Sequence, residues 1–229
     1  MLHPSKFVLV IPQSSHWLAI RKGKILLAPS PKGDWDSFII NYNRARFINK
    51  GDVVIEAGAC IGATAISISH KADKVIAIEP DPLNFVFLRE NIKLHRCENI
   101  ILINKALWSS KREIKMYVAS TFTGHSLMRP IALSKPFSGK IIKVEADTLD
   151  NIVAELNIKK VDVLLMNIEG AEMEALKGAE ETLKKVKRIS IDCHSRELKD
   201  KVINFLRARG FTVQVEGSDV HAERRDVKG

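Results

Sequence analysis

The feature that most constrains the fold is a regular alternation of short apolar runs and helix-like segments, which starts at Gly51. The run Val53–Ile55 precedes the helix-like segment Ala63–His70, and Lys74–Ile78 precedes Leu83–His95. Short, continuous apolar runs are typical of strands that are buried on both faces of a parallel sheet. Strands that alternate with helices predict an α/β fold in which helices cover both faces of one sheet.

The same alternation continues toward the end of the chain. Ile114–Val118 and Ile141–Val144 are expected to form a hairpin or extra strands. The other expected strands are Asn99–Ile103, Val161–Ile168, Arg188–Cys193, Phe211–Val215 and Val220–Glu223. The other expected helices are Thr148–Leu156, Ala171–Val186 and Arg196–Arg209.

The length of 229 residues suits one full domain with a small appendage. We therefore expect an α/β domain over residues 51–229 and an N-terminal extension over residues 1–50. In the extension, Asp34–Asp36 follows a stretch with prolines and a glycine, and we expect it either to fold over a ligand as a lid or to form a surface turn. The long loop Ser120–Gly139 is a second candidate for substrate recognition, with His125 as a contact.

The composition argues against several classes of protein. No apolar run approaches the roughly 18 residues of a membrane-spanning helix, and Phe7–Ile11 is too short for a secretory signal. The three cysteines form no C-x-x-C pair, so we expect reduced thiols, no metal site and a cytoplasmic protein. The 36 Lys and Arg against 27 Asp and Glu give a net charge of +9, which permits a nucleic-acid partner, but no long basic block is present.

Ligands of open parallel sheets bind at the carboxyl ends of the strands, so the residues after each expected strand are the candidates for a site. The first strand leads into EAGACIG, Glu56–Gly62. Gly58 would permit a turn with unusual dihedral angles, and Gly62 would let the next helix begin close to the strand. The loop lacks the G-x-G-x-x-G of dinucleotide sites, and Glu56 suits an amine-bearing ligand better than a pyrophosphate. A tight turn without a ligand is the alternative.

Glu79 follows the second strand, about 20 residues after Gly58, which is the spacing at which an acid binds a ribose diol. Its two oxygens could accept hydrogen bonds from both hydroxyls, although a cap for the helix that starts at Pro82 is the alternative. After the third strand, the backbone of Ala106 and Leu107 would lie against an adenine ring. Together these features predict a bound nucleoside that lacks a pyrophosphate.

Polar side chains also follow the fourth and fifth strands. Asn167, Glu169 and Glu172 follow the fourth strand, and His194 follows the fifth. Because imidazole titrates near neutrality, His194 is a possible general base in the same crevice. The alternatives are that the acids only favour a helix N-terminus, and that His194 or Ser195 only caps the helix that follows.

Five stretches are distinctive when taken together, above all NIEGAEMEALKG over Asn167–Gly178. The others are VIEAGACIG (Val54–Gly62), AIEPDPLNFVFLREN (Ala77–Asn91), NKAL (Asn104–Leu107) and DTL (Asp147–Leu149). With these stretches, the chain from Gly51 onward resembles the FkbM-type family of class I S-adenosylmethionine-dependent methyltransferases.

The resemblance implies a Rossmann-like, mostly parallel sheet of seven strands, the last of them antiparallel, and S-adenosylmethionine as the methyl donor. Glu56, Gly58 and Gly62 would hold the methionine end of the donor, and Glu79 its ribose. Asn167 stands where the family usually has an acid. The whole implied cofactor site comprises Glu56, Gly58, Ala59, Cys60, Gly62, Glu79, Pro80, Ala106 and Leu107.

Methyl transfer is an in-line displacement, so the protein must hold the acceptor at near-attack distance and help it to lose a proton. We expect His194, Glu169 and Asn167 to form the catalytic group, and O-methylation of a hydroxyl on a small molecule or sugar to be the reaction. Asn167 does not begin the N-P-P-[YF] motif of many amino-nitrogen methyltransferases. The alternatives are an RNA methyltransferase that uses the basic surface, and a catalytically silent cofactor-binding protein. A NAD-dependent dehydrogenase is disfavoured because Glu56 lies beside a loop without G-x-G-x-x-G.

Overall fold

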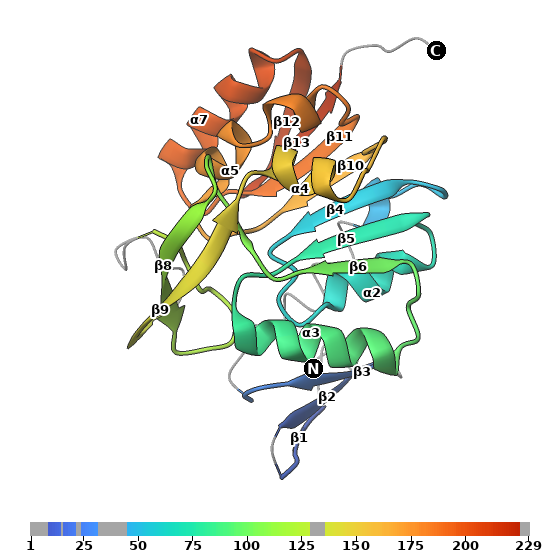
Figure 1. Cartoon of the computed structure of the whole chain (residues 1–229), viewed down its shortest axis with the longest axis vertical. Helices are drawn as coiled ribbons and strands as arrows, with labels where there is room; N and C mark the ends of the chain where they lie inside the picture. Colours follow the sequence, from blue (N-terminus) through green and yellow to red (C-terminus); the bar gives the residue numbers. More distant parts are fainter. Residues whose placement is uncertain (1–8, 15, 22–23, 32–44, 129–135, 225–229) are drawn as a thin grey trace, which may run out of the picture.

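The computed structural model describes residues 9–14, 16–21, 24–31, 45–128 and 136–224, and its centre is a seven-stranded sheet (Figure 1). The strand order is β12-β13-β11-β10-β4-β5-β6. The strands are β4 (Val53–Ala57), β5 (Lys74–Ile78), β6 (Ile100–Ile103), β10 (Val163–Met166), β11 (Arg188–Asp192), β12 (Phe211–Glu216) and β13 (Asp219–Arg224). The last strand, β13, runs antiparallel to both of its neighbours, while β4, β5, β6, β10 and β11 are parallel. The expected Rossmann-like methyltransferase sheet is therefore confirmed.

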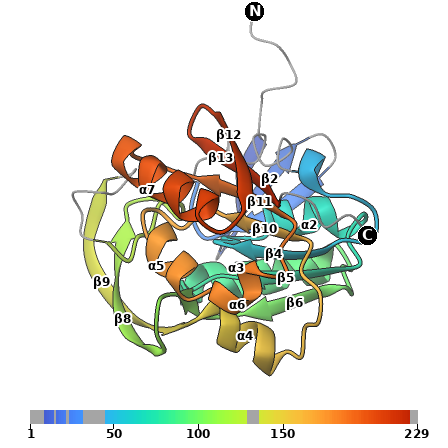
Figure 2. The same ribbon diagram turned by 90° about the horizontal axis from the view of Figure 1, so that it is seen from above.

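Helices pack on both faces of this sheet (Figure 2). Val54 and Val75 point to one face, where they pack with α2 (Ala63–Ser69) and α3 (Pro82–Leu94). The next residues, such as Ile55, point to the other face and pack with the remaining helices. Those helices are α4 (Leu149–Glu155), α5 (Glu172–Lys177), α6 (Glu180–Leu183) and α7 (Arg196–Arg207). Burial on both faces explains why these strands are continuous apolar runs.

The single helix expected over Ala171–Val186 is wrong, because the structure has two short helices, α5 and α6, in its place. The break lies at Gly178, where a β-carbon would collide with the carbonyl oxygen of Trp108. The carboxylate of Asp150 then accepts the N–H groups of Glu181 (3.0 Å) and Thr182 (2.7 Å) at the start of α6. Tertiary contacts at this position outweigh the helical periodicity of the sequence.

A second, three-stranded sheet follows β6 and lies to the left of the central sheet in Figure 1. It consists of β7 (Ala106–Leu107), β9 (Phe137–Asp147) and β8 (Arg112–Ala119), in this order. The β8 and β9 strands pair antiparallel, with Ile114 opposite Val144, as the hairpin expectation requires. The described part of the connection between them ends at Met128 and resumes at Pro136.

A third sheet, β1 (Leu9–Pro12), β2 (Trp17–Arg21) and β3 (Lys24–Ala28), is antiparallel and was not expected from the sequence. Its strand β3 lies against α3. Leu26 packs in one cluster with Ile61 of the loop after β4 and with Phe122. The expected lid at Asp34–Asp36 lies outside the described residues.

The chain enters the central sheet through a short 3-10 helix, η2 (Ala45–Phe47). The Phe47 ring stacks on His221 of β13 with ring centroids 4.3 Å apart. Next to it, the guanidinium group of Arg188 donates to both carboxylate oxygens of Asp52 at 2.8 Å. Among the helices that the structure describes, none has the length and hydropathy needed to cross a bilayer.

Candidate active site

The loop after β4, which the sequence assigned to a cofactor, is held by backbone contacts with both neighbouring strands. The N–H groups of Gly58 and Ala59 donate to the carbonyl oxygen of Ile78 at 2.9 and 3.0 Å. Gly58 has a φ of 83°, and a β-carbon there would collide with the carbonyl oxygen of Asn167. Only glycine fits this position, because both the dihedral angle and the space exclude a side chain. The loop is thereby fixed against the ends of β5 and β10.

The same loop ends at Gly62, where α2 begins close to α3. A β-carbon at Gly62 would lie 2.7 Å from a methyl group of Leu88. Before it, the thiol of Cys60 donates to the carbonyl oxygen of Phe122 at 3.6 Å. Burial and the charge of Glu79 raise the pKa of this thiol well above its usual value. Cys60 is therefore a neutral thiol rather than a nucleophile at neutral pH.

The carboxylate of Glu79 lies directly beyond β5 and is only 5% exposed. One oxygen accepts the N–H of Cys60 and the other accepts the N–H of Asp81, both at 2.8 Å. Burial raises the pKa of Glu79 to about 7, the charge of Asp81 adds to this rise, and the two backbone donors oppose it. A carboxyl group at this strand end is thus balanced between its two protonation states near neutral pH.

The turn after β6 is tied to the same strand end. The side-chain amide of Asn104 donates to the carbonyl oxygens of Glu79 (2.8 Å) and Pro80 (3.2 Å). Ala106 and Leu107, which the sequence placed at an adenine ring, are buried and form β7, paired with β9. The turn that leads to Ala106 and Leu107, the expected adenine residues, is therefore tied to Glu79, the expected ribose residue.

The three expected catalytic residues meet at the ends of β10 and β11. The Nε2 atom of His194 lies 3.0 Å from Oδ1 of Asn167 and 3.4 Å from Oε1 of Glu169. Because an amide oxygen only accepts hydrogen bonds, Nε2 is the protonated ring nitrogen in this arrangement. In the neutral imidazole, Nδ1 then carries the lone pair that can accept a proton.

Glu172 holds the turn that carries Glu169. Its Oε1 atom accepts the N–H groups of Ile168 (3.3 Å) and Gly170 (3.2 Å), and its side chain is fully buried. Burial raises the pKa of this carboxyl group. Glu169 itself has a left-handed φ of 54°, a conformation that few residues adopt without support. Glu172 therefore does more than favour the helix N-terminus, because it positions Glu169.

The segment after β8 contacts both the loop after β4 and the turn that carries Glu169. At one end, the carbonyl oxygen of Phe122 accepts the side-chain amide of Asn84 at 2.8 Å as well as the Cys60 thiol. At the other end, the hydroxyl of Ser126 donates to the carbonyl oxygen of Glu169 at 2.6 Å. Sequence reasoning missed these contacts because they involve backbone carbonyl groups, for which the sequence carries no signal.

His125, expected as a substrate contact, lies within this segment. Its Nδ1 atom accepts the N–H of Ala119 at 3.0 Å, and its Nε2 atom lies 3.9 Å from a carboxylate oxygen of Asp81. Burial lowers the pKa of His125, which favours the neutral ring that these contacts require. Within the described ranges, no group of three or more His, Cys, Asp and Glu side chains is arranged to hold a metal ion.

Known proteins resemble this chain in sequence and in fold. The family described as the methyltransferase FkbM domain matches residues 56–213. The chain is 24% identical over 210 residues to 31-O-demethyl-FK506 methyltransferase FkbM of Streptomyces tacrolimicus, an alignment that covers 76% of this chain and 80% of that protein.

Two solved structures show a similar fold. The methyltransferase FkbM from Methylobacillus flagellatus superposes with a TM-score of 0.54 and 18% identity, over 75% of this chain. The chain spans only 43% of the length of that protein. TYW2 of M. jannaschii, crystallised in complex with AdoMet, has a TM-score of 0.51 and 16% identity, over 95% of this chain and 90% of its own.

Proposed function

This chain belongs to the methyltransferase FkbM domain family and is a methyltransferase, and from this premise we propose that it transfers a methyl group from S-adenosylmethionine to a hydroxyl group of a small molecule. The observation that carries the proposal is one backbone contact. The turn at Gly58, on the cofactor side, packs directly against Asn167, which contacts His194. A methyl donor on one side of this contact and a proton acceptor on the other fit a transfer to oxygen.

The residues around the turn suit this cofactor. Glu79 offers two acceptor oxygens for the ribose hydroxyls, and the buried carboxyl group of Glu56 suits the ammonium group of the methionine end. When bound, the cofactor supplies a methyl group on a positively charged sulfur. The complex of TYW2 with AdoMet supports the same cofactor for this fold.

We assign removal of the hydroxyl proton to His194. Oδ1 of Asn167 accepts the Nε2–H of the imidazole, so Nδ1 is the nitrogen that can take up the proton. The carboxylate of Glu169, 3.4 Å from Nε2, stabilises the positive charge that the ring gains when it takes the proton. An oxygen acceptor agrees with the name of the S. tacrolimicus relative, which acts on a 31-O-demethyl compound.

The cofactor assignment is tested by calorimetry with S-adenosylhomocysteine. Micromolar binding to the wild-type protein is expected, with at least about a tenfold loss in Glu79→Ala, because the ribose loses its charged acceptor. Glu90→Ala is the matched control, since Glu90 is an exposed acid whose partners are Arg89 and Lys93. A folded wild-type protein that does not bind S-adenosylhomocysteine would overturn the proposal.

The acceptor class is tested by a screen of hydroxyl compounds, with formation of S-adenosylhomocysteine as the readout. The expected products are methyl ethers, identified by mass spectrometry. Methylation of amines alone, or of RNA alone, would contradict the assignment to small-molecule hydroxyl groups. Tight cofactor binding without turnover of any compound would favour the silent binding protein.

A further inference from the structure

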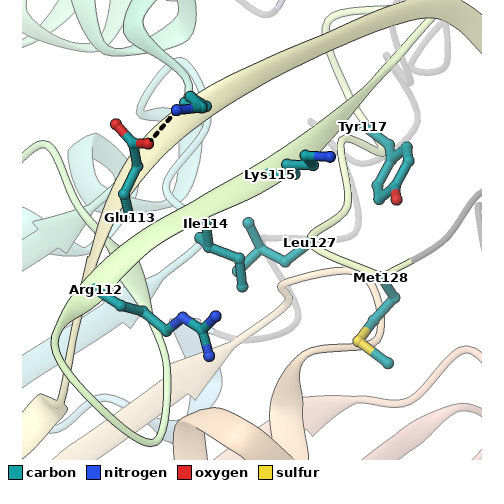
Figure 3. Close-up of a pocket in the computed structure, with 8 residues that line it drawn as sticks. Arg112, Glu113, Ile114, Lys115, Tyr117, Leu127 and Met128 are labelled. Atoms are coloured by element: carbon teal, nitrogen blue, oxygen red, sulfur yellow. Dashed lines mark ion pairs between the residues drawn. The ribbon is translucent and has the colours of Figure 1, made fainter.

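A groove of about 460 Å³ runs along β8, outside the residues assigned to the cofactor and to proton transfer (Figure 3). Ile114 and Leu127 lie together at its centre, where both belong to one apolar cluster. Met128 forms one side of the groove and is 39% exposed, which is unusual for a methionine beside a core. The groove therefore offers an apolar surface of the size of a ring or a short chain.

The charges around this apolar surface are not balanced. Arg112, Lys115 and Lys143 line the groove together with one acid, Glu113. The ammonium group of Lys143 pairs with Glu113 at 2.6 Å, so these two charges compensate each other. In the described ranges, the side chains of Arg112 and Lys115 form no hydrogen bond or ion pair. Arg112 lies on the same face of β8 as Ile114, and Lys115 points to the other face, as the alternation of side chains along a strand requires (Figure 3). The uncompensated Arg112 beside the apolar surface, with Lys115 adding to the positive charge of the rim, is complementary to an anion with an apolar body.

The groove adjoins the catalytic group through its Met128 side. A β-carbon on Gly170 would lie 3.4 Å from Cγ of Met128, so the two residues are in contact. Gly170 directly follows Glu169, which lies 3.4 Å from His194. The neighbouring Ser126 donates to the carbonyl oxygen of Glu169 at 2.6 Å, which fixes this side of the groove to the same turn. A molecule in the groove thus borders the turn that carries Glu169.

We propose that this groove binds the methyl acceptor and that the acceptor is an anionic amphipathic molecule. Its carboxylate, sulfonate or phosphate group contacts Arg112, its apolar body covers Ile114 and Leu127, and its hydroxyl group extends past Met128 toward His194, while Lys115 adds positive charge at the rim of the groove. The inference rests on the proposed function, because it assigns the substrate class of the same site.

The test uses two fluorescent probes of the same shape. The anionic probe is 1-anilinonaphthalene-8-sulfonate, and the uncharged one is N-phenyl-1-naphthylamine, which lacks the sulfonate. The wild-type protein is expected to bind the sulfonate at one site, at least about tenfold more tightly than the uncharged probe, because the sulfonate meets the uncompensated guanidinium group of Arg112. Equal affinity for both probes would overturn the proposal.

A pair of charge-reversed variants locates the binding. Arg112→Glu/Lys115→Glu is expected to weaken sulfonate binding by at least about tenfold. The matched control is Lys159→Glu/Lys185→Glu, which changes the net charge by the same amount at two exposed lysines away from the groove. An equal loss in both variants, or no loss in the groove variant, would overturn the proposal. Thermal unfolding confirms that each variant is folded.

Two further readouts separate this proposal from the cofactor assignment. Affinity for S-adenosylhomocysteine is expected to be the same in the groove variant and in the wild-type protein, so a failure of cofactor binding and a failure of the groove are distinguishable. Any acceptor that the hydroxyl screen yields is expected to displace the sulfonate probe. An acceptor that is methylated while the probe stays bound would overturn the assignment of the groove to the acceptor.

Discussion

The side chain of Asn91 and the backbone of Leu27 exchange two hydrogen bonds, as two strands of a sheet do. Oδ1 of Asn91 accepts the N–H of Leu27 at 2.7 Å, and Nδ2 donates to its carbonyl oxygen at 2.9 Å. The same Nδ2 donates to the carbonyl oxygen of Ile61 at 2.9 Å. Asn91 is completely buried. One amide therefore joins the N-terminal sheet to α3 and to the loop after β4.

Replacement of this amide is expected to destabilise the protein. Asn91→Ala leaves one N–H and two carbonyl groups without their partner, so we expect the free energy of unfolding to fall by about 3 kcal/mol. Urea unfolding measures the change. Glu90→Ala, on the exposed side of the same helix, is the control, for which a change within about 0.5 kcal/mol is expected. Similar losses in the two variants would show that the amide does not join these elements.

Cofactor affinity is expected to depend on pH through Glu79. Its pKa of about 7 means that the cofactor-free protein must lose a proton at low pH before both oxygens can accept from the ribose. Affinity for S-adenosylhomocysteine should therefore fall about tenfold from pH 8 to pH 6.

Glu79→Gln is the control for this pH dependence, because its amide does not titrate in the range. It should bind more weakly and with a flat pH profile. Calorimetry in two buffers of different ionisation enthalpy should detect proton release on binding to the wild-type protein at pH 6. A flat wild-type profile contradicts the assignment of the ribose to Glu79.

Proton transfer is expected to depend on His194 and, less strongly, on Asn167. His194→Ala should lower kcat by about 10²- to 10⁴-fold, since the acceptor hydroxyl loses its base, while the affinity for S-adenosylhomocysteine stays within about twofold. Asn167→Ala should lower kcat by about tenfold, because the imidazole stays but loses its orientation. Arg196→Ala, on the next helix, is the control. If His194→Ala retains the wild-type kcat, the base is another group.

The energetic cost of the close contact at Gly58 can be separated from the cost of its backbone conformation. Gly51 has a φ of 85°, close to the 83° of Gly58, but no atom lies within 4 Å of a β-carbon at Gly51. Gly51→Ala should therefore cost about 1 kcal/mol of unfolding free energy, from strain alone. Gly58→Ala should cost at least about 3 kcal/mol, because it also collides with Asn167. Equal costs would mean that the two loops can move apart.

The central strands and the position of the site were predictable from the sequence. The strand expected over Lys74–Ile78 agrees with β5 residue for residue, because a strand buried on both faces is apolar throughout. His194, Asn167 and Glu169 come together because the carboxyl ends of parallel strands meet at one edge of a sheet. The roles of the cofactor and catalytic residues, and of the lid, stay predictions.

Other features depend on contacts that no local pattern encodes. The break at Gly178 results from the approach of Trp108, which is distant in the sequence. The N-terminal strands left a weak signal, since only Lys22 and Gly23 separate Trp17–Arg21 from Lys24–Ala28, a spacing typical of hairpins. The groove along β8 combines residues of β8, β9 and the segment between them, so its charge balance emerges only in three dimensions.

The contact between Gly58 and Asn167 has a consequence for how such an enzyme can diversify. It joins the two loops through main-chain atoms on both sides, so the spacing between the loops does not depend on which side chains they carry. The groove that we propose for the acceptor lies elsewhere, along β8. On this proposal, substitutions along β8 can change which compound is methylated, while the spacing of the two loops is inherited unaltered.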